Sequence, residues 1–169
     1  MSASRTKPKA KSMIGTPTDR EIRIERVFDA GRDRLWQAFT DPKLVAQWWA
    51  RGHEVVIERM EVKPGGHWRC VEQGPNGAQT VEGHYREVTP PERLVRTFEW
   101  KGMPEPMLVQ TVTFEDLGGR TKLVTVSSFP SQHERDEMLH SGMEQGLEQS
   151  YAALDKLLAA PGKSRAKRR

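Results

Sequence analysis

Residues 131–160 read SQHERDEMLHSGMEQGLEQSYAALDKLLAA, and they contain the most regular pattern of the sequence. Apolar side chains recur in it at three- and four-residue spacing, which is typical of an amphipathic helix. The stripe consists of Leu139, Met143, Leu147, Tyr151, Leu154 and Leu158. Ser131 followed by Glu134 forms a capping pattern at the start, and Pro161-Gly162 marks the end. The pattern predicts one long C-terminal helix with a single apolar face.

Two glycines interrupt this helix near its apolar stripe. Gly142 and Gly146 lie one helical turn apart. Each glycine costs a helix interior about 1 kcal/mol relative to alanine. We therefore expect them to serve close packing or contact with a ligand.

The sequence before this helix has the pattern of consecutive strands. Six short segments alternate in hydropathy and are bounded by Gly, Pro or Asn, which predicts strands joined by tight turns. The segments are 53–62, 67–73, 80–88, 93–100, 107–116 and 121–129. Consecutive strands with short connections form an antiparallel meander.

The N-terminal part adds a strand and two helices. Residues 21–28, EIRIERVF, alternate as a half-buried strand does, while 32–39 and 42–49 have helical spacing. The element order predicts an α+β fold in which a curved seven-stranded antiparallel sheet wraps around the long C-terminal helix. The two short helices after the first strand would close one end, and Gly83 would help the sheet to bend.

Length and charge indicate one domain with basic ends. A chain of 169 residues suits a single domain, for which we expect the bounds 20–160, between flexible basic tails at 1–19 and 161–169. Nine of the 27 Lys and Arg residues lie in 1–13 and 161–169, and the remaining 18 face 23 Asp and Glu residues. The domain itself is therefore acidic, which argues against a specific nucleic-acid partner.

Several other classes of protein are disfavoured by missing patterns. No segment approaches the roughly 20 apolar residues of a membrane span, and the N-terminus lacks the apolar region of a secretory signal. A single cysteine, Cys70, permits no internal disulfide and no multi-thiolate metal site. Nucleophile-elbow, phosphate-loop and dinucleotide motifs do not occur. We therefore expect a cytoplasmic protein without a metal or cofactor.

Four stretches of the chain resemble a known superfamily. ERVFDAGRDRLWQAFTDPKLVAQWW (25–49) resembles the opening of the START-like (SRPBCC, helix-grip) superfamily. RMEVKPGGHWRC (59–70), EGHYREVTPPERLVRTFEW (82–100) and SGMEQGLEQSYAALDKLL (141–158) resemble its branch related to the activator of heat-shock protein 90 ATPase. The resemblance implies a helix-grip fold with a deep cavity between the last helix and the sheet. In relatives that cavity holds lipids, sterols, polyketides or other apolar molecules.

The function favoured by the sequence is therefore binding of a small apolar or amphipathic ligand, without catalysis. We expect aromatic, methionine and neighbouring side chains to form the site, with His84 available to a polar group of the ligand. The candidates are Trp49, Trp68, Cys70, His84, Tyr85, Trp100, Met107, Val109, Met143, Leu147 and Tyr151.

Two alternative functions remain open at this point. A cyclase-, aromatase- or hydrolase-like enzyme would need a buried His, Glu or Arg directed into the cavity. A chaperone-regulating protein would dock its partner through the outer sheet face or a tail. Independently of function, the edge strands of the sheet would permit a homodimer. His133, Glu137 and His140 have the spacing of metal ligands on a helix, but an exposed polar helix face explains them more simply.

Overall fold

The strand predicted from EIRIERVF is β2 (Glu21–Phe28), and it alternates as its sequence does. Every second residue, from Ile22 to Phe28, is buried, and the residues between them are half-buried. The structure, a computed structural model, describes residues 11–49, 53–99, 103 and 105–160. Strand β2 supplies one wall of the interior.

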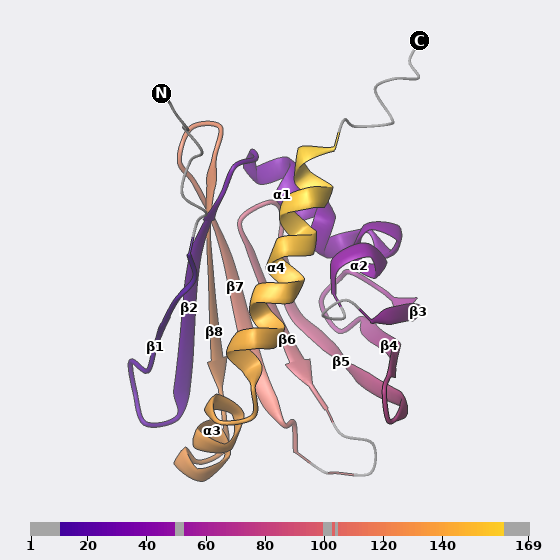
Figure 1. The fold of residues 1–169 in the computed structure, drawn as a ribbon, viewed down its shortest axis with the longest axis vertical. Coiled ribbons are helices and arrows are strands. Elements are labelled where there is room, and N and C mark those ends of the chain that lie inside the picture. Colours follow the sequence, from indigo (N-terminus) through magenta and orange to yellow (C-terminus); the bar gives the residue numbers. More distant parts are fainter. Residues whose placement is uncertain (1–10, 50–52, 100–102, 104, 161–169) are drawn as a thin grey trace, which may run out of the picture.

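The strands form a single eight-stranded sheet in the order β1-β2-β8-β7-β6-β5-β4-β3, and this order can be followed in Figure 1. All neighbouring strands are antiparallel. The strands besides β2 are β1 (Met13–Gly15), β3 (Glu54–Met60), β4 (His67–Gly74), β5 (Gly77–Thr89), β6 (Arg93–Phe98), β7 (Leu108–Asp116) and β8 (Thr121–Ser128). Strands β3 to β8 are the predicted meander, and β2 joins it by pairing with β8.

The prediction of seven strands was one too few. The additional strand, β1, lies within 1–19, which we expected to be a flexible tail. It pairs with β2, with Ile14 opposite Ile24, and Ile14 packs against the core. A strand of three residues is too short for an alternating pattern to be recognised, and it was therefore not predicted.

The two short helices are confirmed as α1 (Arg32–Thr40) and α2 (Pro42–Trp48). The side chain of Asp41 caps α2 by accepting a hydrogen bond from Lys43 N, and Pro42 occupies the first helical position, where a missing N–H costs nothing.

The predicted single C-terminal helix is instead two helices, α3 (Gln132–Leu139) and α4 (Met143–Ala159). The helical path is interrupted at Gly142, whose φ of 88° lies in the left-handed region and is incompatible with a right-handed helix. Ser131 does cap α3, since its Oγ accepts a hydrogen bond from Glu134 N at 3.2 Å. No helix in the described part of the chain is both long and apolar enough to cross a membrane.

Helix α4 crosses one face of the sheet (Figure 1). Arginines from β2 and α1 fix its C-terminal half. Arg26 donates two hydrogen bonds to the Asp155 carboxylate, at 3.1 and 2.7 Å. Arg34 donates to the last carbonyls of the helix, at Leu157, Leu158 and Ala160. A cation at these carbonyls also complements the negative end of the helix dipole.

Candidate ligand-binding cavity

A cavity of about 400 Å³ lies between α4 and the sheet. This volume is within the range of about 300–1,000 Å³ that is usual for small-molecule sites. Apolar side chains dominate the lining, for example Ile22 and Ile24 from β2, Phe98 from β6 and Leu108 from β7. The interior is therefore not filled by the protein's own side chains.

Five of the predicted site residues line this cavity: Trp49, Met107, Met143, Leu147 and Tyr151. The last three follow one another at four-residue spacing on α4, as the apolar stripe predicted. Gly146 lies on the same helix face and also lines the cavity, which agrees with the expectation that a glycine here leaves space for a ligand.

Trp68, Cys70 and Tyr85 are buried on the inner face of the sheet, as predicted, but they do not line this cavity. Trp68 and Cys70 border a separate space of about 10 Å³, and Tyr85 is 1% exposed. Burial raises the pKa of the Cys70 thiol to about 11, although the positive charge of Arg96 opposes this shift. Cys70 is therefore a protonated core residue at neutral pH and not a nucleophile.

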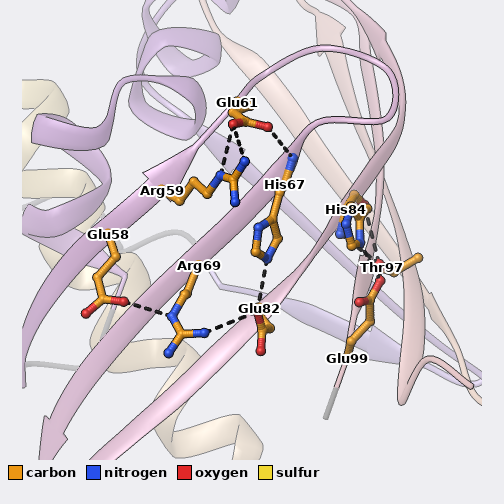
Figure 2. Close-up of polar contacts among 9 residues, drawn as sticks. All are labelled: Glu58, Arg59, Glu61, His67, Arg69, Glu82, His84, Thr97 and Glu99. Carbon is orange, nitrogen blue, oxygen red and sulfur yellow. Dashed lines mark hydrogen bonds and ion pairs between the residues drawn. The ribbon is translucent and has the colours of Figure 1, made fainter. Parts of the chain in front are cut away.

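His84 and Val109 lie on the opposite face of the sheet from the cavity, which corrects their predicted placement. The His84 side chain is 49% exposed, and its Nδ1 lies 3.0 Å from Glu99 Oε2 (Figure 2). Val109 is half-buried between Leu108 and Gln110, the two β7 residues that do line the cavity. The predicted site residue Trp100 lies outside the described residues.

The outer face of β3 to β6 carries a network of charged side chains (Figure 2). His67 Nε2 lies 2.9 Å from Glu82 Oε1, and the His67 and His84 rings stack at a centroid distance of 4.9 Å. Burial raises the pKa of Glu99, but hydrogen bonds from His84 and Thr97 outweigh burial and lower it overall. The network is a paired polar surface, as expected for the outward side of these strands.

The histidine and glutamate side chains of α3 that have the spacing of metal ligands are exposed, as the simpler interpretation of the sequence predicted. His133 and Glu137 form an ion pair at 3.3 Å, with side chains 79% and 67% exposed, and His140 is the C-cap residue. Within the described residues, no group of three or more His, Cys, Asp and Glu side chains could hold a metal ion.

Sequence reasoning missed Arg96, which is the most unusual residue of the lining. It is 3% exposed, and its guanidinium carbon lies 5.0 Å from the ring centroid of Trp49, 5.7 Å from that of Trp68 and 5.5 Å from that of Phe98. Burial lowers its pKa, yet arginine remains protonated in proteins. The signal was present in RLVRTF, where Arg96 shares the two-residue spacing of inward-facing Leu94 and Phe98.

A polar groove of about 470 Å³ adjoins the cavity. Glu72, Gln79 and Gly146 line both spaces, so the groove forms a mouth for the cavity. Amide and hydroxyl side chains contribute to its remaining lining, including Asn76, Ser141, Gln145 and Gln149. The combined site thus has an apolar interior and a polar entrance.

Comparisons with known proteins identify the same kind of fold. The model of the family "Activator of Hsp90 ATPase homolog 1-like protein" matches residues 29–159. A solved structure from Rhodobacter sphaeroides is 28% identical, with a TM-score of 0.81, and the match covers 90% of this chain and 100% of that chain. Protein Ms6760 from Mycobacterium smegmatis is 21% identical, with a TM-score of 0.77 and coverage of 89% and 98%.

A third similar structure, from Arthrobacter aurescens, is 24% identical, with a TM-score of 0.74, and the match covers 89% of this chain and 92% of that chain. The last two likenesses are evidence for the fold alone. The search of the curated proteins finds no match.

Proposed function

The chain belongs to the family of Activator of Hsp90 ATPase homolog 1-like proteins, a branch of the START-like superfamily, and on this basis we propose that it binds a small amphipathic molecule between α4 and the sheet. The observation that carries the proposal is the cavity of about 400 Å³ with its largely apolar lining. Burial of an apolar ligand surface in such a space contributes roughly 25 cal/mol per Å².

The polar mouth supports an amphipathic rather than a purely apolar ligand. A molecule that fills the interior can leave a hydrated group among the amide side chains of the groove, where water remains accessible. Ser150 Oγ donates to the carbonyl of Trp49 at 3.0 Å and so fixes the end of α2 against α4. The walls of the site are thus held in place by the protein itself, which reduces the entropy cost of binding.

Binding can be tested with the neutral fluorescent probe phenylnaphthylamine and a variant that fills the cavity. Leu147→Trp places a larger ring where Leu147 lines the cavity, while Leu117→Trp makes the same change at a residue that is 42% exposed. We expect the wild type and Leu117→Trp to enhance probe fluorescence in a saturable manner, and Leu147→Trp to lose this enhancement while remaining folded by circular dichroism.

Two results would count against the proposal: a wild type that shows no saturable binding, or a folded Leu147→Trp variant that binds the probe as well as the wild type does. Native mass spectrometry of the purified protein adds an independent readout, because a ligand retained from the expression host appears as a mass increment.

An enzymatic role is the second candidate, and one observation favours it. Arg96 and Glu72 are buried, 3% and 6% exposed, and both line the cavity, which meets the requirement for an ionisable group in the interior. Regulation of a chaperone and pairing of two copies through the edge strands β1 and β3 stay predictions.

A further inference from the structure

Arg96 is a buried cation with no acidic partner. Every Asp and Glu of the chain lies within the described residues, and no ion pair joins any of them to the Arg96 guanidinium. Its hydrogen-bonding partners, Gln110 and the Tyr85 hydroxyl, are both uncharged. The three surrounding aromatic rings compensate part of the desolvation cost through cation–π contacts. A negative charge would compensate far more of it, and the open side of this residue faces the cavity.

The hydrogen bond between Arg96 and Gln110 determines which groups remain available. Arg96 Nε can only donate, so the Gln110 atom at 3.0 Å is the carbonyl oxygen Oε1. The groups left for a ligand are therefore the terminal N–H groups of Arg96 that the Tyr85 hydroxyl does not engage, and the amide N–H groups of Gln110. All of them are donors, and the ligand group that matches them is an acceptor with a negative charge, such as a carboxylate.

The sheet register places these donors in one polar strip. Arg96 is the cross-strand partner of Gln110, and Gln110 is the partner of Ser127. All three residues line the cavity, and apolar residues such as Ile22 and Leu108 flank them. A ligand head group on this strip would have its apolar body against Trp49, Phe98 and the face of α4.

The one acidic residue of the lining lies at the other end of the cavity. Glu72 on β4 is the cross-strand neighbour of Gln79 on β5, and both residues also line the groove at the mouth. On β4, Cys70 and Trp68 separate Glu72 from the position beside Arg96. A carboxylate head at the mouth would meet the like charge of Glu72, whereas the inner strip offers positive charge and donors.

We propose that the ligand is an amphipathic carboxylic acid whose carboxylate accepts hydrogen bonds from Arg96 and Gln110. This inference rests on the proposed function and narrows its ligand class. It also assigns Arg96 as the residue that decides between acidic and neutral ligands.

The test measures the affinity of two matched pairs of ligands by isothermal titration calorimetry at neutral pH. The pairs are decanoic acid with decanol, and naphthylacetic acid with its amide, so that an unsuitable apolar body in one pair does not decide the result. Arg96→Met keeps an apolar side chain of similar length, and Arg93→Met removes the same charge from an exposed position on the same strand.

We expect the wild type and Arg93→Met to bind the acids about 10- to 100-fold more tightly than their neutral partners, as charge-assisted hydrogen bonds would provide. Arg96→Met should lose this preference and keep the affinity for the neutral ligands. Gln110→Glu is a second variant, which places a carboxylate of the protein beside Arg96 and should weaken the acids alone. It decides the question even if Arg96→Met fails to fold.

The outcomes separate this inference from the proposed function. Equal affinity for acids and neutral partners, or a preference that survives both folded variants, overturns the assignment of an acidic ligand and leaves cavity binding intact. No binding of any of the four compounds, nor of phenylnaphthylamine, overturns both.

Discussion

Cys70 illustrates how a single buried side chain links stability to pH. Burial raises the pKa of its thiol from 9.0 to about 11, so in the pH range between these values the unfolded chain releases a proton that the folded protein keeps. The contribution is complete below pH 9.0 and is lost as pH rises towards 11. We expect the wild type to lose on the order of 2 kcal/mol more than Cys70→Ala across this range.

Urea unfolding of both proteins at a series of pH values measures this difference. Tyr85 and Tyr151, whose pKa values burial also raises, are present in both proteins, so their effect cancels in the comparison. If the free energy of unfolding depends on pH in the same way for the wild type and Cys70→Ala, the raised pKa of the Cys70 thiol is contradicted.

Gly83 is required by a close approach between strands. A Cβ atom at this position would lie 1.8 Å from the carbonyl oxygen of Thr97 and 2.9 Å from Trp68 Nε1. We expect Gly83→Ala to lower the free energy of unfolding by about 2–4 kcal/mol, because backbone atoms must move. Gly15→Ala is the control, since a Cβ there meets nothing within 4 Å, and it should change stability by less than about 0.5 kcal/mol.

Apolar residues of the candidate site could be predicted from the sequence, whereas its polar residues could not. Met143, Leu147 and Tyr151 follow from helical spacing, because apolar side chains recur on the face that is buried. Arg96 and Gln110 occupy inward positions of their strands, yet a charged or amide residue in an alternating pattern is ordinarily assigned to the solvent face. The predicted site residue Val109 is the apolar neighbour of Gln110 and lies on the other side of β7.

At the scale of secondary structure, the pairing of Arg26 with Asp155 attaches α4 to β2. The Arg26 side chain is 5% exposed and Asp155 is 45% exposed. Asp155→Ala removes the carboxylate that balances a buried cation, so we expect a loss of about 2–4 kcal/mol in the free energy of unfolding. Glu137→Ala breaks the exposed ion pair with His133 and should cost at most about 0.5 kcal/mol.

Chemical denaturation of the two variants provides the comparison. A similar small loss for both would mean that this half-buried pair contributes no more than a surface pair. Helix α4 would then be held by its apolar face, by the bonds from Arg34 and by the bond between Ser150 and Trp49.

The elements themselves were well predicted because local patterns determine them. Strand alternation and turn residues located β2 to β8, and the proline and aspartate between α1 and α2 located both helices. The division between α3 and α4 was missed because the apolar stripe continues from Leu139 to Met143 across the break. A glycine in the left-handed conformation can interrupt a helix without disturbing the regular spacing of apolar residues along the sequence.

For the whole molecule, the path of the chain could be predicted and the space inside it could not. Short turns require neighbouring strands to pair, and a helix with one apolar face must cover the sheet. Whether the interior is filled depends on how individual side chains pack, for example on Gly146 in place of a larger residue. The resemblance to a family supplied that expectation, which the spacing of residues alone did not.

Arg96 provides a test at this scale, because a binding residue buried in the core should lower the stability of the empty protein. Without ligand, its charge is compensated by uncharged partners, namely Gln110, the Tyr85 hydroxyl and three aromatic rings. Arg96→Met fills similar volume without a charge, so we expect the empty variant to be as stable as the wild type or more stable by about 1–3 kcal/mol. Arg93→Met, at an exposed position, should differ from the wild type by less than about 0.5 kcal/mol.

An acidic ligand should reverse this order. At a free concentration of about 100 times Kd, it stabilises the wild type by about 2.7 kcal/mol, and it should leave Arg96→Met much less affected. Thermal unfolding with and without decanoic acid measures both effects. If empty Arg96→Met proves several kcal/mol less stable than the wild type, Arg96 is a structural member of the core, and its position in the cavity wall then reflects packing of the three aromatic rings around it.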